Sequence, residues 1–243
     1  MFDHITIRVA DRDASETFYD KVLRPLAIDQ SYRTNTFSEW GEFLVTERDH
    51  GHPPTRGLHV GFVAPSRAQV DRFWQIGTEA GYRDDGPPGL RSQYAPDYYG
   101  AFLLDPDGNS VEAVHDSRPN RSGIVDHLWI RVSDVQTAKA FYETIAPYAG
   151  IHLDTDTPER VQFRPADGGS VSFVTGTPTE HLHLAFGTHD NGDVDRFHEA
   201  AVAAGYASNG GPGERPRYHP GYYAAFALDP DGNNIEVVNH NRD

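Results

Sequence analysis

The sequence predicts an α+β protein built from two tandem copies of one domain, each with a curved sheet whose convex face is covered by helices. Two observations carry this prediction. The segment Y-Y-G-A-F-L-L-D-P-D-G-N-S-V-E at 98–112 returns 124 residues later with eleven of its fifteen positions identical. Strand-like and helix-like spacings of apolar residues also follow each other in the same order in both halves. This period exceeds that of a solenoid repeat and indicates a duplicated domain.

The two halves align almost without gaps, so domain limits follow from the sequence. The polar stretch between them contains both Pro and Gly, as linkers commonly do. We predict an N-terminal domain at 1–118, a linker at 119–123 and a C-terminal domain at 124–243. The matching segments are D-H-I-T-I-R-V (3–9) with D-H-L-W-I-R-V (126–132), and L-H-V-G-F (58–62) with L-H-L-A-F (182–186).

The first element of each copy is predicted to be a strand with two unlike faces. In Phe2–Val9 the odd positions from 5 onwards are apolar, whereas the even positions include His4, Thr6 and Arg8. Such alternation is typical of a strand with one face on a core. We expect the face with His and Arg to line the open, concave side of the sheet. The corresponding residues of the second copy are His127, Trp129 and Arg131.

A helix and several short strands are predicted to follow. The pattern A-x-x-x-F-x-x-x-V at 14–22 has helical spacing. The segments D-x-x-E at 13–16 and S-x-x-Q at 133–136 are typical of capping boxes that start this helix in the two copies. The segments 30–46 and 161–175 are weakly patterned, and we expect two or three strands of a curved sheet in each.

The same order of elements restarts in the second half of each copy. Leu58–Val63 alternates as a strand, with His59 and its small neighbour Gly61 on the less apolar face. A helix follows that begins with a capping box at 66–69, and its counterpart occupies 190–205. The repeated D-P-D-G-N segment is a tight turn, because Pro fixes φ and Gly and Asn accept positive φ. Each copy therefore contains two βαβββ modules.

Composition and charge exclude several functions. The 243 residues carry a net charge of −15, which argues against nucleic acid or an anionic membrane surface as a partner. No apolar run has the length of a membrane span. The absence of Cys excludes disulfides and thiolate ligands. We expect a cytoplasmic protein without a signal peptide.

Two glutamates raise the main chemical question. Glu112 and Glu236 stand inside apolar strand segments, where an unpaired carboxylate costs free energy. Each copy also carries two strand histidines at closely matched spacing. Two imidazoles and one carboxylate suit a divalent metal ion such as Fe(II), Mn(II), Ni(II) or Zn(II). The alternative is a duplicated metal-free ancestor. The candidate ligands are His4, His59 and Glu112 in the first copy and His127, His183 and Glu236 in the second.

These motifs resemble those of the vicinal oxygen chelate superfamily, which includes glyoxalase I, extradiol dioxygenases and bleomycin-resistance proteins. The resemblance covers both copies through D-H-x-x-I-R-V, L-H-[VL]-[GA]-F and D-P-D-G-N-x-[VI]-E. It implies two tandem glyoxalase-like domains, in which paired βαβββ modules form a half-barrel. It also implies that the three candidate ligands of each copy form one site. The family pairs half-domains in more than one way, so sites that combine strands of both domains stay open.

Two classes of function follow from the resemblance. The first is a metal-dependent enzyme, a dioxygenase or a lyase or isomerase, that activates a small substrate through adjacent oxygens on the metal. The second is a metal-free protein that binds an antibiotic, as bleomycin-resistance proteins do, although those typically lack the ligand set. Glyoxalase I adds a fourth ligand, for which Glu42 and Glu47 are candidates. The second copy offers none, so three ligands look more like the extradiol dioxygenases.

The resemblance to dioxygenases also implies His and Tyr near the metal. Three histidines of the second copy have no counterpart in the first, which predicts that the C-terminal site is the more competent one. Arginines on the ligand-bearing face are candidates to anchor a substrate carboxylate or to neutralise a buried acid. The catalytic candidates are His181, His219, His240 and Tyr223. The substrate-binding candidates are Arg8, Arg131, Trp129 and Tyr99. The expected partner is a small molecule, and the chain is expected to be a monomer that imitates a dimer, or a homodimer.

Overall fold

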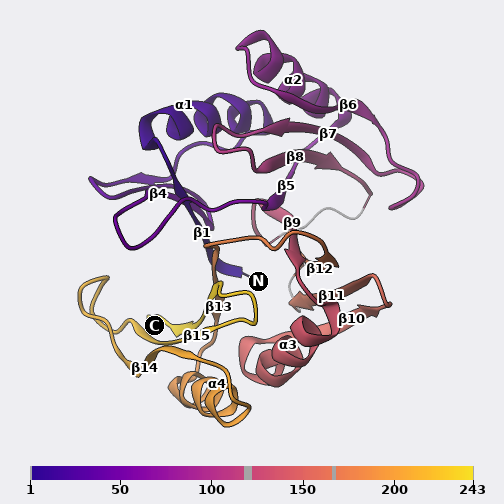
Figure 1. The fold of residues 1–243 in the computed structure, drawn as a ribbon. Coiled ribbons are helices and arrows are strands. Elements are labelled where there is room, and N and C mark those ends of the chain that lie inside the picture. Colours follow the sequence, from indigo (N-terminus) through magenta and orange to yellow (C-terminus); the bar gives the residue numbers. More distant parts are fainter. Residues whose placement is uncertain (1, 118–121, 166–167, 243) are drawn as a thin grey trace.

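The computed structural model describes residues 2–117, 122–165 and 168–242. It contains two open sheets of eight strands each. Helices α1 and α2 lie together at one end of the molecule, and α3 and α4 lie together at the other (Figure 1). The predicted α+β fold class, with two tandem domains of paired βαβββ modules, is confirmed.

Four βαβββ modules follow one another along the chain. The first contains β1 (Phe2–Val9), α1 (Arg12–Leu23), a 3₁₀ turn (Arg24–Leu26), β2 (Tyr32–Arg33), β3 (Phe37–Trp40) and β4 (Phe43–Glu47). The second contains β5 (His59–Val63), α2 (Arg67–Glu79), β6 (Asp84–Leu90), β7 (Tyr99–Leu104) and β8 (Ser110–His115). The third contains β9 (Val125–Val132), α3 (Val135–Ala149), β10 (Ile151–Asp156), β11 (Arg160–Pro165) and β12 (Val171–Thr175). The fourth contains β13 (His183–Gly187), α4 (Asn191–Ala203), β14 (Ser208–Glu214), β15 (Tyr223–Leu228) and β16 (Asn234–Asn239).

Modules from different sequence copies share a sheet. The first and fourth modules form one sheet, with the order β14-β15-β16-β13-β1-β4-β3-β2, which we call the module 1–4 sheet. The second and third modules form the module 2–3 sheet, with the order β10-β11-β12-β9-β5-β8-β7-β6. Antiparallel pairing of β1 with β13, and of β5 with β9, joins the modules within each sheet.

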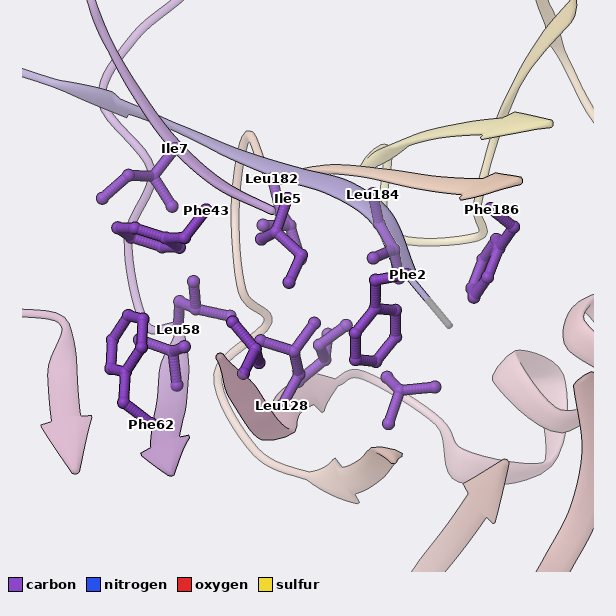
Figure 2. Close-up of a cluster of buried hydrophobic side chains, with 14 of the residues drawn as sticks. Phe2, Ile5, Ile7, Phe43, Leu58, Phe62, Leu128, Leu182, Leu184 and Phe186 are labelled. Atoms are coloured by element: carbon purple, nitrogen blue, oxygen red, sulfur yellow. The ribbon is translucent and has the colours of Figure 1, made fainter. Parts of the chain in front are cut away.

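The apolar faces of the two sheets turn towards one another and build the core (Figure 2). The side chains of Phe2 and Ile5 extend from β1 towards Leu128 of the other sheet. The rings of Phe43 and Phe62 meet edge to face across the two sheets, with centroids 5.2 Å apart. Because burial of each such side chain contributes roughly 1.5–3 kcal/mol, this shared core holds the sheets together and leaves their polar faces outward.

The helices complete the core at its two ends. Helix α1 packs on β4 and on α2, and α3 packs on its own module and on α4. Phe18 of α1 and Phe141 of α3 are fully buried. Each meets a tyrosine edge to face, Tyr82 at 4.7 Å and Tyr206 at 4.8 Å between ring centroids. None of the described helices combines the length and apolarity needed to cross a membrane.

The helix starts partly differ from the predicted capping boxes. Ser66 caps α2 as predicted and accepts a hydrogen bond from the Gln69 backbone N–H at 3.3 Å. The caps of α1 and α3 are instead Asp11 and Asp134. Aspartate is at least as good an N-cap as serine. Ser133 is therefore free to donate its hydroxyl hydrogen to Asp231 in the second D-P-D-G-N turn, at 2.6 Å.

Candidate metal centres

Strand pairing brings His4, His183 and Glu236 together on the polar face of the module 1–4 sheet. Ala185 of β13 lies opposite His4 of β1 and also opposite Glu236 of β16. The two His Nε2 atoms are 2.9 Å apart. Glu236 Oε2 lies 2.9 Å from Nε2 of His183 and 3.5 Å from Nε2 of His4. We call these three residues the first triad.

The module 2–3 sheet repeats this arrangement with His59, Glu112 and His127, the second triad. Here Gly61 of β5 lies opposite His127 of β9 and opposite Glu112 of β8. Nε2 of His59 lies 3.1 Å from Nε2 of His127 and 3.0 Å from Glu112 Oε2, which is 3.3 Å from His127. A Cβ added to Gly61 would collide with the His127 ring. The close approach of the second triad therefore requires glycine at position 61.

Each triad takes residues from both copies of the repeat. The first triad combines one His of the N-terminal copy with a His and a Glu of the C-terminal copy, and the second triad does the reverse. The grouping by copy implied by the resemblance is therefore wrong, and the open alternative, strands of both domains, is correct. The reason is that the two modules of each copy belong to different sheets. His4, His59 and Glu112 do not form one group, and neither do His127, His183 and Glu236.

Hydrogen bonds orient all four triad histidines. Nδ1 of His4 lies 2.7 Å from a carboxylate oxygen of Asp3, and Nδ1 of His183 lies 2.7 Å from the Asn234 amide. Because the outer nitrogen of each ring is engaged, Nε2 points to the shared centre. The corresponding pairs in the second triad are His127 with Asp126 at 2.9 Å and His59 with Ser110 at 3.0 Å.

A tyrosine fixes one oxygen of each buried glutamate. The Tyr222 hydroxyl donates to Glu236 Oε1 at 2.6 Å, and the Tyr98 hydroxyl donates to Glu112 Oε1 at 2.8 Å. Tyr98 and Tyr222 are not among the candidates predicted from the sequence, although the hairpin register contains the signal. Glu112 pairs with Phe102, so Tyr98, four residues before Phe102, falls on the glutamate face.

The two donor sets fit a divalent cation. In each triad three ligand atoms converge with separations of 2.9–3.5 Å. Ligand atoms that lie about 2.1 Å from an ion and at right angles to each other are about 3.0 Å apart. Glu112 and Glu236 are each only 1% exposed, and a cation would balance these buried charges. Each buried Glu thus has two imidazoles and one tyrosine as partners, in an arrangement that could also hold a metal ion.

Burial and hydrogen bonding shift the pKa values of the second triad. Burial acts to lower the pKa of His127, but hydrogen bonds to Asp126 and Glu112 outweigh it and raise the pKa to about 10. Burial acts to raise the pKa of Glu112, but hydrogen bonds to His127 and His59 hold it at about 2. The protein alone thus keeps a charged His127 against an ionised Glu112, and a metal must displace that proton.

Neither candidate fourth ligand joins a triad. The Glu42 carboxylate accepts a hydrogen bond from the Val125 backbone N–H at 2.8 Å and so connects β4 to the start of β9. Glu47 is exposed at the end of β4. On the strands beside β1 and β9, the residues aligned with Thr6 and Trp129 are Leu44 and Ser172. Neither is a carboxylate, and among the described residues each triad consists of two His and one Glu.

Two of the predicted catalytic histidines lie beside the first triad. His240 Nε2 lies 2.8 Å from Asp3, and its Nδ1 lies 2.8 Å from His219 Nε2. The rings of His219 and His240 are stacked, with centroids 5.1 Å apart. Since Asp3 also contacts His4, a chain of hydrogen bonds leads from the first triad to the half-buried His219.

The structure does not bring the other two catalytic candidates, or one substrate-binding candidate, to a triad. His181 is exposed and has a left-handed backbone, with φ of 59°. The Tyr223 hydroxyl donates to Asp195 on α4, and the Tyr99 hydroxyl donates to Asp71 on α2. Both tyrosines lie on the helix side of their strands, because alternation turns them away from the neighbours that contact the glutamates.

The remaining substrate-binding candidates lie near the triads. A cavity of about 1040 Å³ lies over the second triad, and Trp129 and Arg131 line it. The Trp129 ring stands edge-on to His59, with centroids 6.4 Å apart. Arg8 lies on the polar side of the module 1–4 sheet, where its charge contributes to the lowered pKa of His183 after the larger effect of burial.

Curved sheets of paired βαβββ modules are the architecture of the vicinal oxygen chelate class of protein. The model of the Glyoxalase/Bleomycin resistance protein/Dioxygenase superfamily matches residues 1–113 and 124–237. The chain belongs to this superfamily.

Solved structures share the fold over nearly the whole chain. A V278E mutant of glyoxalase I from Zea mays is 19% identical, with a TM-score of 0.73, over 98% of this chain and 92% of that chain. A putative dioxygenase from Bacillus subtilis is 14% identical, with a TM-score of 0.66, over 99% of this chain and 85% of that chain. No curated protein matches the sequence significantly. At these identities the likeness concerns the fold.

Proposed function

We propose that the chain is a metal-dependent enzyme that acts on small substrates through two adjacent oxygen atoms, with each triad holding one divalent ion. The observation that supports this is the donor geometry, two His Nε2 atoms and one Glu oxygen converging in both sheets. When bound, such an ion supplies Lewis acidity, which stabilises negative charge that develops on the substrate oxygens.

The chain's own residues have separable tasks in this proposal. Asp3 and Asp126 accept from Nδ1 of the neighbouring His and so keep its Nε2 aimed at the centre. Tyr98 and Tyr222 hold one oxygen of each Glu and leave the other for the ion. At the first triad, His240 and His219 stand where they can take up or deliver a proton, because both ring nitrogens of His240 are within hydrogen-bond distance of a partner.

Metal content of the purified protein tests the proposal. We expect about two equivalents of a divalent metal after reconstitution, and His183→Ala should remove about half because it breaks one triad. His181→Ala is the matched control, since this neighbouring His lies outside both triads, and its metal content should equal that of the wild type. Elemental analysis by mass spectrometry measures all three. A protein that retains no metal would instead favour the antibiotic-binding alternative, and unchanged content in His183→Ala would mean that the ligands are assigned wrongly.

A further inference from the structure

The cavity over the second triad contains guanidinium groups without an ion-pair partner among residues 2–117, 122–165 and 168–242. Arg131 donates to the backbone carbonyl of Gly57 at 2.9 Å. Arg160 lies over the Trp129 ring, with its guanidinium carbon 5.6 Å from the centroid. Arg91 lies over another aromatic ring of the cavity and donates to a backbone carbonyl. A backbone carbonyl does not neutralise a cation, so these positive charges remain available to a ligand.

Most acidic side chains of the same cavity are already engaged. Asp126 contacts His127, and Asp154 pairs with Arg164 at 3.1 Å. Asp85 accepts from the Ser110 hydroxyl at 2.7 Å, which leaves its charge in place, and Glu112 belongs to the second triad. The chain as a whole has a net charge of −15. The guanidinium groups that lack an ion-pair partner among the described residues are therefore a local feature of this cavity, which the overall composition does not explain.

The first triad has different residues at the matching positions. The pairing registers of β3–β4 and β11–β12 align Arg160 with Phe37 and Gln162 with Glu39. Trp129 aligns with Thr6 in the same way. Burial acts to lower the pKa of His4, but Asp3 and Glu236 outweigh it, and the nearby charge of Glu39 adds a smaller rise. The two sites thus share their ligand set but differ in charge around it.

We propose that the second site takes a small planar substrate that carries a carboxylate in addition to its two adjacent oxygens. Arg131 and Arg160 bind the carboxylate, and Trp129 forms the wall along the planar body. Guanidinium groups match carboxylates in shape and charge, and stacking on the indole holds Arg160 in place. The indole also stands beside His59, so it lies between Arg160 and the triad. The position of the two oxygens rests on the proposed function, whereas the carboxylate subsite does not.

Isothermal titration of the full chain with a matched pair of probes tests this substrate class. We choose 3,4-dihydroxybenzoate and its methyl ester, which share the ring and both hydroxyls and differ in charge. The zinc-loaded protein should bind the acid at least about tenfold more tightly than the ester. Arg160→Met and Arg131→Met should each reduce the affinity for the acid towards that for the ester and leave the ester unchanged. Arg160→Lys, which keeps the charge, should retain part of the preference, and Arg8→Met at the other triad should retain all of it.

The outcomes separate this inference from the proposed function. Equal affinity for acid and ester, a preference that survives in both Met variants, or no binding of either probe at millimolar concentration would each overturn the carboxylate subsite. Repeating the titration on protein treated with chelator tests the metal. A preference for the acid that is the same with and without zinc would support the subsite while counting against the chelating role of the second triad.

Discussion

The buried glutamates show how single residues determine the candidate sites. In the sequence, Glu112 and Glu236 are carboxylates in apolar strands, and in the structure each contacts two His and one Tyr. Leaving such a group unpaired would cost several kcal/mol. In each hairpin, the hydroxyls of two adjacent tyrosines have different partners. One donates a hydrogen bond to the buried Glu, and the other donates to a carboxylate on a helix.

This division predicts unequal effects of two matched substitutions. Tyr222→Phe removes the hydrogen bond to Glu236 Oε1, and it should weaken metal binding at the first triad about tenfold, as losses of outer-shell partners commonly do. Tyr223→Phe is the control, because its hydroxyl contacts Asp195 on α4. Competition with a chromophoric chelator measures both. Equal affinities in the two variants would show that the Glu does not need its tyrosine.

A second prediction at the scale of the residue concerns how stability changes with pH through Asp229. Burial raises the pKa of Asp229 to about 6, above its ordinary value of 3.8. The folded protein therefore binds this proton more tightly than the unfolded chain, and its ionisation costs roughly 3 kcal/mol above pH 6. As the pH falls from 7.5 to 5, the melting temperature of the wild type should rise relative to that of Asp229→Asn. Asp231→Asn controls for changes to the turn itself, and a constant gap across this range would contradict the assignment.

At the scale of elements, the fifth and thirteenth strands provide the small residues around which each triad closes. Gly61 lies opposite both His127 and Glu112, and Ala185 lies opposite both His4 and Glu236. The two positions are equivalent, but a Cβ fits only at the second. Strand register and side-chain size together therefore set how closely the ligands approach.

This difference predicts opposite outcomes for reciprocal substitutions. Gly61→Ala should abolish metal binding at the second triad, because the new Cβ displaces the His127 ring. Ala185→Gly should leave metal binding at the first triad intact and cost about 1 kcal/mol of stability, the usual effect of Gly within a strand. Metal stoichiometry and urea unfolding measure the two effects. Full metal occupancy in Gly61→Ala would show that the ring can move without loss of the site.

At the scale of the molecule, the two sequence copies are interdependent, because each sheet contains one module from each copy. If the copies were separated, the strands that pair across them, β1 and β5 in one copy and β9 and β13 in the other, would each expose an unpaired edge. Part of the shared core would also be exposed. We predict that co-expressed 1–118 and 119–243 fragments associate as a 1:1 complex with restored triads. Fragment 1–118 alone should associate with itself or aggregate. Light scattering after size exclusion, with thermal melting, measures this, and a stable folded monomer of either fragment would contradict it.

Much of the fold, and less of the site, could be predicted from the sequence. Alternation identified the His-bearing strands, and residue types identified three potential donors per copy, because both signals are local. The pairing of His4 with His183 rather than His59 depends on which strands meet across the sheet, and local patterns contain no such information. The choice between the two tyrosines of each hairpin, by contrast, follows from the strand register, which places Tyr98 and Tyr222 rather than Tyr99 and Tyr223 on the face of the Glu.

The sharing of each sheet between the two copies also constrains how the protein can evolve. Because each candidate site takes ligands from both copies, loss or replacement of either copy removes ligands from both centres at once. Divergence between the sites must therefore arise by substitution within modules, and the walls can change while the ligands stay. Trp129 and Arg160 in one site, against Thr6 and Phe37 in the other, are such a change.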